Sequence, residues 1–308
     1  MRSVGFLRIV SVATGAQVQL GLTRGTTPKK SGYASENCSL GVFCQYANSV
    51  LFGFCWIAFM GLTSLAVAQE PSPLTVSPEG CRATRSGNIV TIDLGPLASE
   101  SVTIPRLTSS LRQIVWKGVE NEGAAPTLTP EPESWIIRWK VRESNAIELT
   151  FDDAPRLLSE SSPTQANGDG SIFLAASRAI TAGEKIRFEP QTFKNTVGYW
   201  TGKQDSATWT FLVNEPGSYN VAILQGCGKG QGGSEAKLEV FHGAEPASLI
   251  KFEVLETGHF QNFVWRHLGE IELTKAGVWQ LRLSPIAIKA AALMDVRAVH
   301  LVRLPPRR

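Results

Sequence analysis

The segment that most constrains the fold is residues 195–235, which contains two runs where apolar and polar side chains alternate. The runs are residues 209–213 and 219–223, and Pro216-Gly217 between them favours a turn. Strict alternation places every second side chain on the same face of an extended strand. The segment therefore predicts a half-buried β-hairpin rather than a helix.

Short apolar runs bounded by Gly, Pro, Asn or Asp recur along most of the chain. No stretch of residues 81–158 has the periodicity of an amphipathic helix, and the spacing of the runs after residue 171 is typical of a β-sandwich or jelly roll. We therefore predict an all-β protein in which a smaller all-β domain precedes a β-sandwich jelly roll. The expected strands are residues 89–92, 114–116, 135–141, 147–151, 171–174, 185–189, 209–213, 219–223, 236–240, 250–254, 271–273, 279–283 and 295–302.

The expected domain boundaries follow the polar segments. Residues 69–80 contain several prolines and predict a short linker. Residues 159–170, SESSPTQANGDG, are polar and have no apolar pattern, so they predict a second linker. The small β domain then spans residues 81–158, and the sandwich spans residues 171–304.

The first 68 residues read as a leader with an export signal. Residues 49–68 are almost uncharged and apolar, and they end in Ala66-Val67-Ala68, the small-x-small pattern of a signal-peptidase site. Cleavage there predicts a secreted or periplasmic protein with no stable membrane insertion. The alternative is an uncleaved anchor, because a run of this length is long enough to cross a bilayer.

Charge bears on the class of binding partner, and the cysteines bear on possible disulfide bonding. The leader carries five basic groups and one acid, which leaves 25 basic and 26 acidic residues in the remainder of the chain. Without a basic patch, nucleic acid is excluded as an expected partner. The remainder also contains Cys81 and Cys227, which either form one disulfide or remain as free thiols.

The second half of the chain resembles a known family. It is similar to carbohydrate-binding modules of the galactose-binding-like sandwich superfamily, of the family-6 and family-35 types. More narrowly, it looks like a module appended to bacterial α-L-fucosidases and sulfatases. The residues that carry the resemblance are 195–200 (NTVGYW), Asp205, 209–211 (WTF), 216–219 (PGSY), 225–228 (QGCG), 232–235 (GGSE), 257–263 (TGHFQNF) and 294–297 (MDVR).

The resemblance implies a sandwich that binds a poly- or oligosaccharide by its loops and has no catalytic activity of its own. In such relatives the catalytic barrel is a separate, larger domain. The resemblance also implies a structural calcium ion between acids of the sandwich, for which Glu189 and Asp295 are the candidate ligands. An ion pair between Asp295 and Arg297 would explain the acid without a metal.

Aromatic rings and amides are the side chains that a sugar site needs. Sugars present apolar C–H faces that pack on aromatic rings and hydroxyls that need directional hydrogen-bonding partners. Because neighbouring residues of an extended segment face opposite ways, at most one of Tyr199 and Trp200 is expected to be exposed on a given face. The candidate ligand-binding residues are Asn195, Tyr199, Trp200, Gln231, Glu235, Phe260, Gln261 and Asn262.

No motif points to catalysis. The glycine-dense loop at residues 226–234 lacks the Gly-Lys-Ser/Thr ending of a phosphate-binding loop. Cys227 with His259 or His267 has no third orienting group in the sequence. We therefore expect a non-catalytic carbohydrate-binding protein. The rival interpretation is a structural or protein-interaction scaffold of the cell envelope that binds no sugar.

Overall fold

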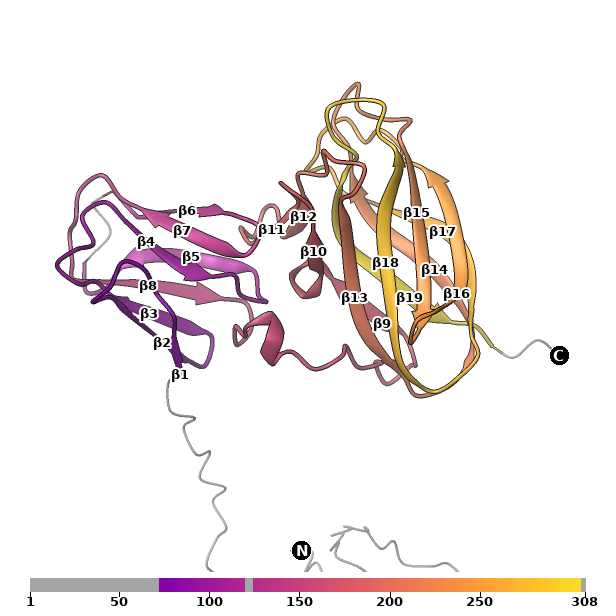
Figure 1. Ribbon diagram of the computed structural model, residues 1–308, viewed down its shortest axis with the longest axis horizontal. Helices are drawn as coiled ribbons and strands as arrows, with labels where there is room; N and C mark the ends of the chain where they lie inside the picture. The colour runs from indigo at the N-terminus through magenta and orange to yellow at the C-terminus, as the bar shows by residue number, and fades with distance from the viewer. Residues whose placement is uncertain (1–71, 120–123, 306–308) are drawn as a thin grey trace, which may run out of the picture. The chain divides into compact units, whose positions relative to one another are not determined.

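A computed structural model describes residues 72–119 and 124–305 of the 308-residue chain. These residues form β-strands and two short 3₁₀ helices, η1 (Leu158–Glu160) and η2 (Ala176–Arg178), and none of them is in an α-helix (Figure 1). The predicted all-β fold class is confirmed. The apolar run at 49–68, with its predicted signal peptide, lies outside the described residues.

The first eight strands form two antiparallel sheets. One sheet has the order β1-β2-β3-β8-β5 and the other has the order β4-β7-β6. The strands form because apolar side chains alternate with polar ones, so that one face of each sheet is buried. Their bounds are β1 (Ser72–Leu74), β2 (Arg82–Ser86), β3 (Ile89–Asp93), β4 (Ser101–Pro105), β5 (Leu111–Trp116), β6 (Thr127–Pro130), β7 (Ser134–Arg138) and β8 (Ala146–Phe151).

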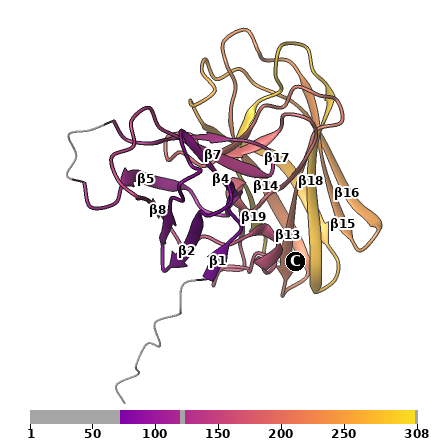
Figure 2. The same cartoon turned by 60° about the vertical axis from the view of Figure 1, so that its left-hand side comes forward.

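The remaining strands form a β-sandwich of two larger antiparallel sheets. One has the order β10-β13-β18-β15-β16. The other has the order β11-β12-β19-β14-β17, with β9 paired to β19. Figure 2 shows the longer strands of both sheets from a second side. The bounds are β9 (Ile172–Ala175), β10 (Ile180–Ala182), β11 (Arg187–Glu189), β12 (Thr196–Gly198), β13 (Ser206–Val213), β14 (Gly217–Gly226), β15 (Glu235–His242), β16 (Glu245–Glu253), β17 (Val264–Leu273), β18 (Gly277–Ala287) and β19 (Asp295–Arg303).

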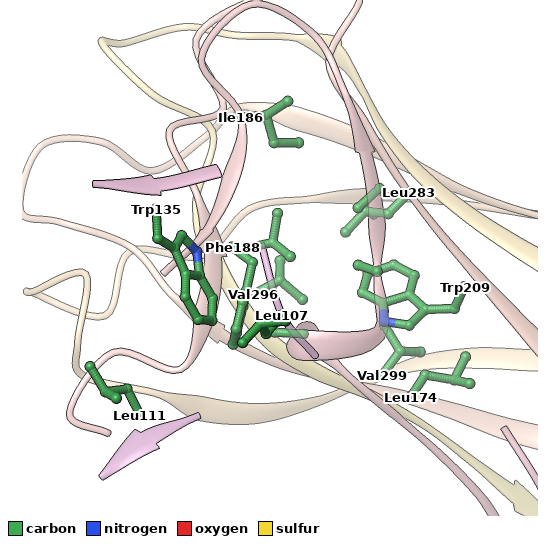
Figure 3. Close-up of a cluster of buried hydrophobic side chains, with 14 of the residues drawn as sticks. Leu107, Leu111, Trp135, Leu174, Ile186, Phe188, Trp209, Leu283, Val296 and Val299 are labelled. Carbon is green, nitrogen blue, oxygen red and sulfur yellow. The ribbon is translucent and has the colours of Figure 1, made fainter. Parts of the chain in front are cut away.

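The predicted hairpin is wrong: both strands form, but they belong to different sheets and do not pair with each other. Strand β13 pairs with β18, and β14 pairs with β17 and β19. Alternation still determines what is buried, because every second residue of β13 points into the space between the sheets. There Trp209 packs near Leu174 and Val299 of the facing sheet (Figure 3). Residues 209–213 and 219–223 therefore line opposite walls of one core.

The polar segment at 159–170 is more ordered than a simple linker. Its Thr164 lies alongside β13: the Thr164 N–H donates to the Thr210 carbonyl at 2.9 Å, and the Leu212 N–H donates to the Thr164 carbonyl at 2.9 Å. Helix η1 includes Ser159 and Glu160. This segment therefore extends the edge of the β13 sheet.

Contacts join the first eight strands to the sandwich. The ring of Phe188 in β11 lies 6.4 Å from the ring of Trp135 in β7, measured between centroids, and both are buried (Figure 3). The guanidinium of Arg106 lies 5.3 Å from the Phe188 ring. The Leu111 N–H donates to the Pro190 carbonyl at 2.7 Å. A hydrophobic cluster thus runs through both groups of strands.

Each predicted strand overlaps an observed one, and the strands that were missed are β1, β2, β4, β6, β10 and β12. Strands β1, β10 and β12 have three residues each, and β6 contains two threonines and a proline.

Cys81 and Cys227 are both free thiols. Within the described ranges, no helix is long and apolar enough to cross a membrane.

Candidate functional site

Three loops meet at one end of the sandwich, and we call them the loop end. They are residues 227–234 between β14 and β15, residues 254–263 between β16 and β17, and residues 288–294 between β18 and β19. Hydrogen bonds between main-chain atoms join the first two loops, from Thr257 N–H to the Cys227 carbonyl at 3.0 Å and from Gly233 N–H to the Val254 carbonyl at 2.9 Å. The loops therefore support one another.

Side chains complete these connections between the loops. The Glu256 carboxylate accepts the Gly230 N–H at 2.7 Å. The Gln231 side-chain oxygen accepts the Ala291 N–H at 3.0 Å, which ties the first loop to the third. Thr257 Oγ1 accepts the Cys227 N–H at 2.8 Å. Sequence reasoning did not identify Glu256, or the role of Thr257 in joining the loops, since nothing in the chain order signals a contact with the glycine loop.

The glycines of the first loop make room for Phe260. A Cβ on Gly226 would lie 2.0 Å from the Phe260 carbonyl oxygen, and a Cβ on Gly228 would lie 2.7 Å from Cε2 of its ring. Such distances are well inside van der Waals contact, so the fixed backbone excludes a Cβ at residue 226, and a Cβ at residue 228 would displace the Phe260 ring. The half-buried Phe260 ring thus rests on the Gly228 backbone. This close approach explains the glycine-dense sequence without a phosphate-binding role.

Two predicted amides follow Phe260 in the same loop. Gln261 is half-buried, and its main-chain N–H donates to Nδ1 of His259 at 3.1 Å. Asn262 is exposed, and its side-chain amide donates to the Thr257 carbonyl. The structure therefore brings Gln231, Phe260, Gln261 and Asn262 together at the loop end.

Of the adjacent aromatic pair, only the tyrosine is exposed. Trp200 is completely buried, its Nε1–H donates to the Val197 carbonyl at 2.9 Å, and its own carbonyl accepts the Leu293 N–H at 3.0 Å. Its ring has no face free for a sugar, so the expectation that Trp200 binds ligand is corrected to a role in the core. Tyr199 is 42% exposed, and the Arg187 guanidinium lies 3.7 Å from its ring centroid.

The other two candidates lie outside the three loops. Asn195 is in the turn between β11 and β12, at φ 43°, and its buried side-chain oxygen has no hydrogen-bond partner. Glu235 begins β15, opposite Glu253 and Ala287, and is exposed. Neither residue has a described hydrogen bond to the loop end.

Two buried acids face each other across Gly198. Glu189 Oε2 and Asp295 Oδ1 each lie 2.8 Å from the position of a Cβ on Gly198. The Lys194 ammonium forms an ion pair with the other oxygen of Glu189. Burial, and then the negative charge of Glu189, raise the pKa of Asp295 to about 8. The cluster thus holds a Glu189–Lys194 ion pair next to a carboxyl that is mostly protonated at neutral pH.

The acid cluster supplies only two carboxyl groups to the calcium site that the resemblance implies. Calcium prefers six to eight oxygen ligands that include ionised carboxylates. Here the Lys194 ammonium pairs with one oxygen of Glu189. No group of three or more His, Cys, Asp or Glu residues that could hold a metal occurs among the described residues. The Arg297 guanidinium donates to the carbonyls of Phe193 and Lys194, so no Asp295–Arg297 ion pair is seen.

Cys227 has the environment of a packed thiol rather than of a nucleophile. It is completely buried, and its Sγ contacts the Gly228 and Leu293 carbonyl oxygens. Burial raises its pKa to about 11, whereas catalytic cysteines have lowered pKa values. His267 lies on β17, where its Nε2 is 3.0 Å from the Asn220 side-chain oxygen.

The sequence matches no protein-family model, and it matches no curated protein. Several solved structures are similar to it. A GH26-CBM35 β-(1,4)-mannanase from Podospora anserina is 14% identical with a TM-score of 0.32, and the match covers 46% of this chain and 29% of the mannanase. An α-L-fucosidase from Vibrio sp. strain EJY3 is 11% identical with a TM-score of 0.29, over 73% of this chain and 39% of that enzyme.

A family-35 carbohydrate-binding module from Clostridium thermocellum is 14% identical with a TM-score of 0.33, and the match covers 44% of this chain and 98% of the module. The chain thus spans less than half the length of the two enzymes, while a part of it spans nearly the whole module. At these identities and TM-scores the similarity carries no argument about function, which rests on the side chains described above.

Proposed function

We propose that this protein is an exported, non-catalytic carbohydrate-binding protein whose sandwich recognises sugar at the loop end. The observation that carries the proposal is the fixed placement of Phe260 on the Gly228 backbone, followed directly by the amides of Gln261 and Asn262. An immobilised ring offers a surface for the apolar face of a sugar, and amides supply donors and acceptors for its hydroxyls. Because contacts within the protein already order these loops, ligand binding loses less conformational entropy than it would with disordered loops.

The proposal that the protein is non-catalytic rests on the state of its reactive side chains. The Cys227 thiol is buried with a raised pKa. Asp152 and Asp153 are the one pair of adjacent aspartates in the sequence. Asp152 accepts a hydrogen bond from the Ser110 hydroxyl and forms an ion pair with Arg112. Neither group has the environment of an activated acid, base or nucleophile. Export rests on the small-x-small end of the apolar run at residues 49–68.

Binding to polysaccharide tests the proposal. The full-length protein is run through native gels that contain one soluble polysaccharide each, and the dissociation constant is obtained from the retardation. We expect dissociation constants in the micromolar to millimolar range. Phe260→Ala should weaken binding about two- to tenfold, because an aromatic contact of this kind is worth roughly 0.5–1.5 kcal/mol.

Leu249→Ala is the control, because Leu249 is 53% exposed on the edge strand β16 and lies outside the three loops. It should bind as the unmodified protein does. Equal binding by Phe260→Ala and the control would exclude the loop end as the site. No retardation by any polysaccharide would exclude the function itself and favour the scaffold interpretation.

A further inference from the structure

The edge strand β16 leaves main-chain hydrogen-bonding groups open. Within the described part of the chain it pairs only with β15, and it ends the five-stranded sheet (Figure 2). In an antiparallel strand the N–H and C=O groups of successive residues point alternately to the two sides. Those of Val254 point toward β15, because its N–H donates to the carbonyl of Ser234, just before β15, at 2.7 Å. The main-chain groups of Leu249, Lys251 and Glu253 therefore point to the open side.

Two side chains of the facing sheet reach the end of this open side. The Gln225 amide donates to the Leu255 carbonyl at 2.8 Å, and the Arg266 guanidinium donates to the Glu253 carbonyl at 2.8 Å. Burial lowers the pKa of Arg266 and the charge of Glu253 opposes this, yet no described ion pair joins the guanidinium to the Glu253 carboxylate. A carbonyl oxygen can accept a second hydrogen bond, so these contacts leave β16 able to pair.

On the outer face of the sheet, β15 places like charges opposite the charges of β16. Strand register pairs Lys237 with Lys251 and Glu235 with Glu253. Like charges directly opposite each other destabilise a sheet. The Lys237 ammonium forms its ion pair within β15, with Glu239 at 3.0 Å, and no ion pair among the described residues includes Lys251. An acid that faces Lys251 from the open side would therefore offset this repulsion.

Residues 249–255, LIKFEVL, are complementary to themselves in antiparallel pairing. With Phe252 opposite Phe252 of a second copy, Lys251 lies opposite Glu253, and the leucines at the two ends of the segment lie opposite each other. These leucines are 53% and 49% exposed, so their contact removes apolar surface from water. Lys251 is the one basic residue of β16, so no other antiparallel register of two β16 strands gives Glu253 a basic partner.

We infer that the protein forms a two-fold dimer in which the β16 strands of two copies pair antiparallel about Phe252. The pairing joins the two five-stranded sheets into one. Lys251 and Glu253 of the second copy exchange hydrogen bonds between their main-chain N–H and C=O groups, and their side chains form an ion pair across the join. A second copy is the occupant that fits, because a two-fold contact needs one self-complementary surface, which this strand supplies. The dimer does not depend on the proposed sugar binding.

The mass of the full-length protein in solution tests this inference. Sedimentation equilibrium is run in a detergent matched in density to the buffer, which keeps the apolar run at residues 49–68 from associating. One strand from each copy makes a small interface, so we expect a weak dimer with a dissociation constant of roughly 10–100 µM. The measured mass should rise from one chain toward two as the protein concentration is raised from about 1 to about 500 µM.

Charge reversal tests the register. Lys251→Glu puts acid opposite acid in both symmetric contacts, and Glu253→Lys puts base opposite base, so each should raise the dissociation constant more than about tenfold. The double variant Lys251→Glu/Glu253→Lys should dimerise as the unmodified protein does, because opposite charges again face each other. An equimolar mixture of the two single variants should also dimerise, since each supplies the charges that the other needs.

The substitutions should leave the fold intact. Within one chain, Lys251→Glu faces Lys237 and Glu253→Lys faces Glu235, so each replaces a repulsion by an attraction. Thermal unfolding of each variant checks this, and loss of the dimer without loss of thermal stability then reports on the contact between copies.

Glu184→Lys and Lys185→Glu are the matched controls, because they make the same changes of charge at exposed positions between β10 and β11. Both should dimerise as the unmodified protein does. Loss of the dimer in the single variants at β16, with recovery in the double variant and in the mixture, supports the pairing. One chain per particle at every concentration overturns it and identifies Lys251 as an edge charge that prevents pairing. Equal dimerisation by the unmodified protein and the single variants, or no recovery, also overturns it.

Discussion

At the scale of single residues, Asp295 shows how its surroundings change what an acid can do. It is 6% exposed and lies across Gly198 from Glu189, while Lys194 pairs with Glu189 rather than with Asp295. Burial is the main reason that its pKa rises to about 8. An acid that reads as a metal ligand in the sequence is thus held mostly protonated in the fold.

Asp295→Asn should remove a pH dependence of stability. Because the folded-state pKa of about 8 lies above the ordinary value of 3.8, the folded state binds this proton more tightly than the unfolded state. The stabilisation is complete below about pH 4 and is lost as the pH rises toward 8. From pH 5 to pH 9 we therefore expect the free energy of unfolding of the unmodified protein to fall relative to that of Asp295→Asn.

Urea unfolding at pH 5 and pH 9 measures this effect. Asp93→Asn, at an exposed position on β3, serves as the control and should leave the pH profile unchanged. An identical loss of stability between pH 5 and pH 9 in the unmodified protein and in Asp295→Asn would show that Asp295 is not the group responsible.

At the scale of elements, the three loops of the loop end are shaped by close backbone approach. Gly226→Ala would place a Cβ 2.0 Å from the Phe260 carbonyl oxygen, and backbone cannot rotate away as a flexible side chain can. We expect a loss of about 1–3 kcal/mol in the free energy of unfolding, as for overpacked sites, and weaker sugar binding because Phe260 is displaced.

Gly168→Ala is the matched control for this substitution. Gly168 lies outside the left-handed region, and a Cβ there meets nothing within 4 Å. Its free energy of unfolding should stay within about 0.5 kcal/mol of the unmodified value. Comparable stability of the two alanine variants in denaturant titrations would contradict the tight contact between Gly226 and Phe260.

At the scale of the whole molecule, buried contacts continue from the first eight strands into the sandwich. Phe188 contacts Trp135, Arg106 lies over its ring, and the Leu111 N–H bonds to the Pro190 carbonyl. Arg106 is itself buried, and burial lowers its pKa to about 10. Separation of the two groups of strands would lose the packing of Phe188 against Trp135 and against the Arg106 guanidinium.

Unfolding of the described part of the chain should therefore occur in one cooperative transition. Phe188→Ala should reduce the free energy of unfolding by about 3–5 kcal/mol, the usual range for a buried phenylalanine. Phe193→Ala, five residues along at a site that is 66% exposed, should change it little. Calorimetry of the three proteins checks this, and two well-separated transitions in the unmodified protein would contradict it.

Local pattern was sufficient to predict much of this molecule. Alternation in β13, β15 and β18 identified strands and their buried faces, because period two is a property of the extended backbone itself. Gln261 and Asn262 were correctly expected beside Phe260 in a loop, since neighbours in sequence remain neighbours in space. The short strands β10 and β12 were missed, because three residues carry too little pattern to recognise.

Features that depend on distant parts of the chain, such as burial and shared faces of a sheet, were decided only by the tertiary structure. Trp200 and Tyr199 are adjacent in sequence, yet only the fold determined which of them is buried. The fold placed Asp295 across Gly198 from Glu189, and strand register brought Phe173, Trp265 and His300 onto one face. Sequence by itself determined periodicity, turns and composition, which are local. Burial and shared faces depend on residues tens of positions apart, and only the folded chain brings those residues together.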